Sequence, residues 1–175
     1  SGSSRGLGDV YKRQIFRRIK RRTMKHQSTK TYGTDRGFSC AFRQPKATHS
    51  HCSLIHGYSL GFKFTFEADY LDDKNWVYDF GNCKWIKKYL EDNFDHTLAV
   101  DMNDPLLADL KQLEGKGLAK VVEMNGVGCE KFAEHVFNYV APQISNETAK
   151  RVKLASVEVF EHGSNSAVYH NTDNV

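Results

Sequence analysis

The sequence is poor in the features that mark membrane proteins and zinc ribbons. No apolar run among its 175 residues approaches the roughly 20 residues that a bilayer-spanning helix needs. Its four cysteines are widely spaced and form no CxxC pair, so neither a zinc ribbon nor a thioredoxin-like motif is indicated. We therefore expect free thiols in a reducing cytoplasm, and no membrane partner.

Basic charge is concentrated at the N-terminus. Residues 1–23 hold eight Lys or Arg against one Asp, a net charge of +7, and since the whole chain carries +4, the part from Met24 onward carries −3. Such a mildly acidic domain predicts no nucleic-acid partner. The stretch SSRGLGDVYKRQ looks like translated linker, so we expect residues 1–23 to be a linker-derived or disordered basic tail. A basic arm that binds nucleic acid or anionic lipid is the alternative. Residues 24–175 are expected to form a single domain.

Alternation over residues 56–68 predicts a long strand with one apolar face. The apolar side chains at its even positions are Tyr58, Leu60, Phe62, Phe64 and Phe66. His56 shares their parity and is expected to face the same side. Shorter strands are predicted over 36–44, 118–124 and 151–161.

Helical patterns lie between these strands. Asp79 is a plausible N-cap for a helix over about 80–93, and Pro105 is placed to begin a short second helix. A third, amphipathic helix is predicted from Glu130 to near Pro142. The order β-β-α-α-β-α-β indicates an α+β domain, with helices packed on one face of an antiparallel four-stranded sheet.

A thiol and three imidazoles lie close together in sequence. A free thiol has a pKa of about 8.5, so Cys52 needs a neighbour to activate it. His49, His51 and His56 could lower that pKa or bind zinc, which takes imidazole readily. Solvated loop residues without a role are the alternative.

Three further polar features could carry chemistry. In Asp95-His96 the carboxylate can orient the ring as a proton shuttle, although such pairs also cap helix ends. Glu161 ends the last predicted strand, where a carboxylate can accept two hydrogen bonds from the guanidine-like edge of a pterin or guanine. Glu130 either contacts a ligand or complements the helix dipole.

These clusters resemble, in their order, the 6-pyruvoyltetrahydropterin synthase / 6-carboxytetrahydropterin synthase family over about residues 31–170. The matching residues are Phe38-Ser-Cys-Ala-Phe42, Cys52, His56-Gly-Tyr58, Asp79-Phe80, Asp95-His96, Glu130 and Glu161…Tyr169. The resemblance implies a T-fold, whose subunits join their sheets into a barrel as a trimer or hexamer with active sites between subunits. It also implies 7,8-dihydroneopterin triphosphate, a pterin, as the substrate.

The resemblance also implies roles for individual residues. Cys52 corresponds to the cysteine that moves protons on the substrate side chain, and Asp95 and His96 correspond to its relay. Glu161 corresponds to the carboxylate that anchors the pterin ring, and Glu130 is a second candidate for substrate binding. Zinc in the family polarises the side-chain hydroxyls as a Lewis acid.

The chain departs from the family at the zinc. The family binds the metal with three histidines, and the corresponding positions here are Phe42, His56 and Tyr58. A loop histidine could replace the lost ligands, a different metal could bind, or the site could hold no metal. We favour a rebuilt zinc site on His51 and His56, because the cysteine and the Asp-His pair are kept.

Four further residues match or depart from the family pattern near the site. Gly128 and Cys129 stand where the family has small hydroxyl residues before the helix Glu, and Arg43 and Lys46 are candidates for triphosphate contact. We expect a 6-carboxytetrahydropterin synthase-like lyase on the path to 7-deazaguanines such as queuosine precursors. The alternatives are a catalytically inactive T-fold protein that binds a pterin or purine, a 6-pyruvoyltetrahydropterin synthase, and a lyase that trims the side chain.

Overall fold

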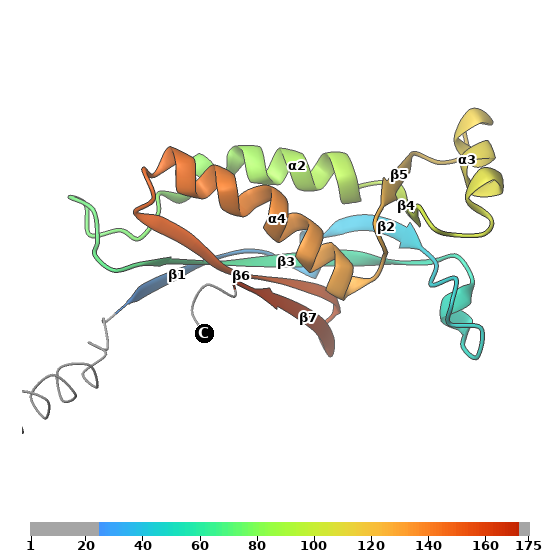
Figure 1. Ribbon diagram of the computed structural model, residues 1–175, viewed down its shortest axis with the longest axis horizontal. Coiled ribbons are helices and arrows are strands. Elements are labelled where there is room, and N and C mark those ends of the chain that lie inside the picture. The colour runs from blue at the N-terminus through green and yellow to red at the C-terminus, as the bar shows by residue number, and fades with distance from the viewer. Residues whose placement is uncertain (1–24, 172–175) are drawn as a thin grey trace, which may run out of the picture.

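The computed structural model describes residues 25–171, and the predicted tail over 1–23 lies outside that range. Within it, a seven-stranded sheet carries two long helices on one face (Figure 1). The strands are β1 (His26–Tyr32), β2 (Phe38–Phe42), β3 (His56–Ala68), β4 (Thr97–Asp101), β5 (Val121–Met124), β6 (Val152–His162) and β7 (Asn165–His170). The helices are α2 (Lys84–Phe94), α3 (Leu107–Gly115) and α4 (Cys129–Glu147), with 3-10 turns η1 (Thr34–Arg36), η2 (His51–Ser53) and η3 (Phe80–Cys83).

The long strand β3 organises the sheet. Along one edge it pairs antiparallel first with β2 and then with β1, and along the other edge its residues 61–68 pair with β6. Beyond β2 the sheet continues through β4 and β5, which run parallel to one another, and beyond β6 it ends in β7. The α+β prediction with helices on one face is confirmed, whereas a four-stranded antiparallel sheet is wrong, because the sheet is larger and mixed.

Three strands were absent from the sequence prediction, and their composition explains why. The sequence of β1 is HQSTKTY, which has no apolar alternation, so this strand depends on its pairing with β3. The strand β4 has only five residues, four of them buried, and short apolar runs do not distinguish strand from helix. The strand β7 is a largely exposed edge strand.

The predicted end of the last helix near Pro142 is also wrong, because α4 continues through the proline to Glu147. A proline inside a helix leaves the carbonyl four residues earlier without its amide donor. Pro142 and Asn138 are both exposed, so water can hydrate that carbonyl. On the opposite side the apolar stripe runs on through Val140 to the buried Ile144.

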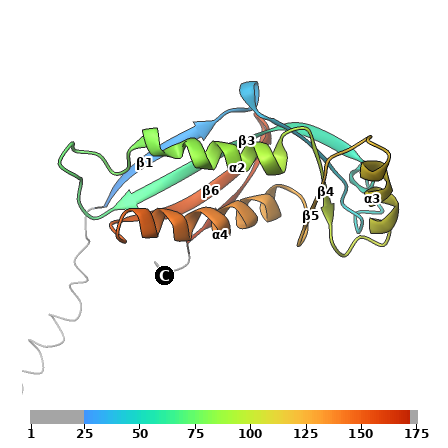
Figure 2. The same ribbon diagram turned by 90° about the horizontal axis from the view of Figure 1, so that it is seen from above.

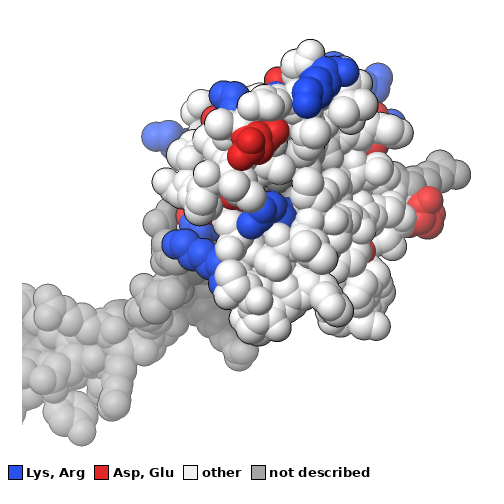
Figure 3. Space-filling model, turned by 90° about the vertical axis from the view of Figure 1, so that its right-hand side faces the viewer, with Lys and Arg blue, Asp and Glu red and all other residues white. Residues whose placement is uncertain are grey.

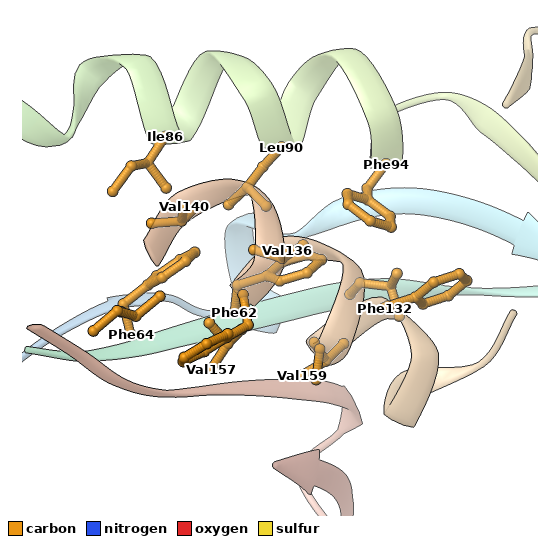
Figure 4. Packing of buried hydrophobic residues seen from close by; sticks show 14 of the residues in the cluster. Phe62, Phe64, Ile86, Leu90, Phe94, Phe132, Val136, Val140, Val157 and Val159 are labelled. Carbon is orange, nitrogen blue, oxygen red and sulfur yellow. The ribbon is translucent and has the colours of Figure 1, made fainter. Parts of the chain in front are cut away.

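The core lies between the two long helices and the sheet. Seen from above, α2 and α4 lie side by side over β1, β3 and β6 (Figure 2). Their apolar stripes meet one another and the inward side chains of β3 and β6 (Figure 4). The labelled residues are Ile86, Leu90, Phe94, Phe132, Val136, Val140, Phe62, Phe64, Val157 and Val159. No helix in residues 25–171 is both long and apolar enough to cross a membrane.

Candidate active site

Three aromatic rings cluster where β2 and β3 meet the start of α4. Phe42 and His56 are opposite one another in the β2–β3 pairing, and their ring centroids are 5.0 Å apart. Tyr58 completes the group, 6.0 Å from Phe42 and 5.6 Å from His56. Phe42 also contacts Phe132 of α4 at 5.2 Å. The three positions that match the family's zinc histidines are therefore grouped on the helix face of the sheet.

A polar pocket of about 430 Å3 opens at the N-terminal end of α4. Cys129 and Glu130 of α4 line it together with Glu161 of β6, Ser164 of the β6–β7 turn and residues 165–167 at the start of β7. The two carboxylates that the sequence predicted for substrate binding thus lie on the walls of one pocket. Their role in binding stays a prediction.

Electrostatics connect this pocket to the aromatic cluster. Burial raises the pKa of Cys129 to about 12, and the nearby charges of Glu161 and Glu130 and a hydrogen bond with Glu161 contribute. Its thiol is therefore protonated at neutral pH and can donate to the Glu161 carboxylate. Burial, and then the charges of Glu161, Cys52 and Cys129, raise the pKa of Tyr58, so its phenol is neutral as well.

Gln44 ties the loop that carries Cys52 to the start of α4. Its backbone N–H donates to the carbonyl of Cys52 at 2.7 Å, and its side-chain amide donates to the carbonyl of Val127 at 2.9 Å. At Gly128 a Cβ would lie 2.2 Å from Gln44 Nε2, so the contact requires glycine there. Sequence reasoning missed Gln44, because one polar loop residue carries no pattern.

Cys52 and the histidines near it occupy two different surroundings. Cys52 is exposed in η2, where its backbone N–H donates to Ser50 Oγ at 3.2 Å. His49 and His51 line a separate surface pocket of about 480 Å3, and His56 is not part of its wall. The ring of His56 belongs to the aromatic cluster. Its Nδ1 lies 2.8 Å from the carbonyl of Leu54, which places the proton on Nδ1 and leaves Nε2 as an acceptor.

The predicted relay pair lies at the other end of β2. Asp95 Oδ1 is 3.0 Å from His96 Nδ1 and accepts from the backbone N–H of Ser39 at 3.3 Å. The side chain of His96 is 85% exposed, and in residues 25–171 no hydrogen bond or ion pair joins this pair to Cys52. One chain therefore forms the Asp-His pair without bringing it to the thiol.

The side chains of one chain do not supply the set of zinc ligands that the resemblance implies. Within the described residues, no three His, Cys, Asp or Glu side chains are grouped so that they could hold a metal ion. Among the three clustered positions Phe42 has no donor atom, and the neutral phenol of Tyr58 is a poor one. Only Nε2 of His56 is suitable. Zinc ligation by His51 and His56 stays a prediction, and no chemical step is derived from it.

The triphosphate candidate Arg43 already has a partner. Its Nε lies 3.4 Å from Oδ2 of Asp104, whose side chain is fully buried. This ion pair gives Arg43 a structural role at the end of β2. On the face that Figure 3 shows, acidic and basic side chains are interspersed over the upper and middle parts, and only the lowest part is uncharged.

The fold and the pocket together define an α+β domain with a carboxylate-lined site between a helix start and a sheet. A family model described as 6-pyruvoyl tetrahydropterin synthase matches residues 32–172, and the chain belongs to this family. The resemblance noted in the sequence is thereby confirmed. The domain boundary at Met24 stays a prediction.

Curated relatives and solved structures agree with this family. The chain is 27% identical over 121 residues to a 6-carboxy-5,6,7,8-tetrahydropterin synthase of Aquifex aeolicus, covering 67% of this chain and 75% of that protein. It is 32% identical over 95 residues to the enzyme of the same name from Rickettsia typhi, covering 53% of this chain and 67% of that protein.

Two solved structures show the same fold. An uncharacterized protein of Wolinella succinogenes superposes with a TM-score of 0.70 at 20% identity, over 85% of this chain and 99% of that one. The 6-pyruvoyl tetrahydropterin synthase of Plasmodium vivax gives a TM-score of 0.63 at 15% identity, over 85% and 98%. The domain has the T-fold.

Proposed function

We propose that the chain is a 6-carboxytetrahydropterin synthase-like lyase that acts on 7,8-dihydroneopterin triphosphate, in the cytoplasm, on the path to 7-deazaguanines such as queuosine precursors. The names of the curated relatives support this reaction. The observation that carries it is the meeting of Glu130, Glu161 and Cys129 in one pocket beside Tyr58.

In this proposal Glu161 anchors the pterin. Its carboxylate accepts hydrogen bonds from the ring N–H and the exocyclic amine, which together form a two-donor edge. Glu130, in the first turn of α4, adds a second acceptor at the same pocket. The anchored ring directs its three-carbon side chain toward the β2–β3 end of the site, where Tyr58 and His56 lie.

Proton transfer on the side chain is assigned to Cys52, with Asp95 and His96 as its relay. Because Asp95 holds Nδ1 of His96, Nε2 of that ring is free to take a proton. The exposed His96 makes no contact with Cys52 in its own chain. A second copy would supply the pair, in agreement with the predicted trimer or hexamer. Zinc on His51 and His56 would supply Lewis-acid polarisation, but no step here requires it.

A catalytically inactive T-fold protein is the second candidate, favoured by Phe42 and Tyr58 at two family zinc positions. One experiment distinguishes the lyase from the inactive binding protein. The chain, purified from Met24, is incubated with 7,8-dihydroneopterin triphosphate, with and without zinc, and the products are identified by mass spectrometry. Formation of 6-carboxytetrahydropterin, and its loss in C52S, supports the lyase. The 6-pyruvoyl product would reassign the branch of the family, and unchanged substrate with intact folded protein would favour the binding role.

A further inference from the structure

We infer that Phe42, His56 and Tyr58 form a metal-independent subsite, in which the Tyr58 hydroxyl and His56 Nε2 hydrogen-bond the side-chain oxygens of the bound pterin. The inference rests on the proposed function, from which it takes the pterin as the ligand. That the subsite works without a metal follows from the side chains themselves, since only His56 offers a suitable metal-ligand atom.

The three rings are spaced at distances close to those of three imidazoles on one zinc ion. With Zn–N bonds of about 2.0–2.1 Å and tetrahedral angles, three imidazoles on one zinc have ring centroids about 5 Å apart. The centroids of Phe42, His56 and Tyr58 are 5.0, 5.6 and 6.0 Å apart. At this spacing two of the three rings offer carbon or a neutral phenol where the resemblance implies a nitrogen donor.

What the cluster offers is a donor and an acceptor side by side. A tyrosine hydroxyl has an ordinary pKa of about 10, so Tyr58 is a hydrogen-bond donor at neutral pH. Within residues 25–171 that hydroxyl makes no hydrogen bond, and it is not among the buried polar atoms that lack a partner. It is therefore open to a ligand. His56 Nε2 is an acceptor, because Nδ1 is held at 2.8 Å by the carbonyl of Leu54.

The neighbours of this pair restrict what can bind. Phe42 is 1% exposed and forms an apolar floor against Phe132, which favours neutral hydroxyl groups over a solvated cation. The nearby His162 contacts the Tyr58 ring at 6.2 Å, but it is no spare metal ligand. Its Nδ1 accepts from Ser164 N at 3.2 Å, and its Nε2 lies 3.3 Å from Asn165 Nδ2. A vicinal diol, as in the pterin side chain, matches one donor and one acceptor on such a floor.

Metal content tests the first half of the inference. The wild-type chain, dialysed against zinc and then buffer, is expected to carry far less than one zinc per chain by elemental analysis. The double variant F42H/Y58H restores three imidazoles and is expected to bind one zinc. Since Phe42 is buried and the double variant could fold poorly, Y58H alone serves as a second variant, with zinc affinity between wild type and the double variant. One tightly bound zinc in wild type that is lost in H56A would overturn the inference.

Ligand binding tests the second half. Y58F should weaken the binding of neopterin, a stable pterin with the same three-carbon side chain, by roughly threefold to tenfold, the value of one neutral hydrogen bond. Y58F should leave unchanged the binding of pterin, which lacks the side chain. Y139F is the matched control, because Tyr139 stacks on Tyr89 at 3.7 Å and does not line the pocket, so it should change neither affinity. Equal weakening of neopterin and pterin, or no weakening, would contradict the subsite.

The two proposals fail in different ways. Catalysis that disappears with a chelator and returns with zinc would keep the lyase and overturn the metal-independent subsite. Absence of any product, together with low zinc content and a neopterin-specific loss in Y58F, would overturn the lyase and keep the subsite.

Discussion

Phe42 and His56 face one another across the β2–β3 pair, yet the first ring is buried core and the second is only half-buried. The phenyl ring packs against Phe132 beneath and against the imidazole beside it. One side chain thus belongs to both the hydrophobic core and the candidate site. Substitutions at this position are expected to change stability and ligand binding together.

Replacing Glu161 with Gln should weaken pterin binding by about tenfold to a hundredfold, because hydrogen bonds to a charged acceptor are stronger than neutral ones. Fluorescence titration with neopterin measures the change. E123Q is a matched control on β5, since Glu123 pairs with Lys111 Nζ at 2.5 Å and neither residue lines the pocket. Equal effects of the two substitutions would remove Glu161 from its assigned role.

Replacing Gly128 with Ala should lower the free energy of unfolding and disturb the pocket. Its φ of 106° lies in a region that is costly for side chains by about 1–3 kcal/mol, and the new Cβ would meet Gln44 Nε2 at 2.2 Å. G117A is the control, because φ there is 70° and no atom lies within 4 Å of the added Cβ. Urea unfolding of both variants should show the larger loss for G128A, and a loss of equal size would mean that the Gln44 contact is unimportant.

Truncating Phe132 to Ala should reduce the free energy of unfolding by about 3–5 kcal/mol, since it removes a fully buried ring. That ring contacts Phe42 and Phe94, each at 5.2 Å, so the cavity would lie directly beneath the aromatic cluster. L118A, at a side chain that is 72% exposed, should change stability by no more than about 0.5 kcal/mol. Denaturant titration compares the two, and a small effect in F132A would show that α4 repacks.

Stability should fall below neutral pH in part because of His135. Burial beside Tyr89, whose ring is 6.3 Å away, lowers the pKa of His135 from its usual 6.5. The unfolded chain then binds the proton more readily than the folded one, so its contribution is complete above about pH 6.5 and is lost as pH falls through the lowered pKa. Urea unfolding at several pH values should show a shallower pH dependence in H135Q. A slope in H135Q equal to that of the wild type would remove His135 from this pH dependence.

Sequence reasoning succeeded where side chains alternate or repeat strongly. The apolar alternation of 56–68 and the stripes of α2 and α4 report directly on burial, and the order of motifs identified the family. It failed for β1, whose polar residues form a strand because β3 offers them a ladder of backbone partners. It also missed Gln44, whose side-chain hydrogen bond to the carbonyl of Val127 spans 83 residues of sequence.

For the site, the sequence identified the segments that carry the candidate residues, but it did not predict the distances between them. Glu130 and Glu161 come from different elements, and only the packing of α4 on β6 brings them to one pocket. Cys52 and His96, by contrast, are both exposed, and no hydrogen bond or ion pair joins them within residues 25–171, so their predicted cooperation depends on the proposed second copy.

The two parts of strand β3 differ in how they are paired with neighbouring strands. Its residues 62–68 are held by neighbours on both edges, whereas residues 56–60 pair with β2 alone. The chemically variable positions 56 and 58 fall in the singly paired part, so exchanging them leaves most of the ladder untouched. In such a strand the reactive side chains can be substituted one at a time while the doubly paired part still forms and the fold is retained. An aromatic trio in place of three metal ligands is an outcome that this freedom allows.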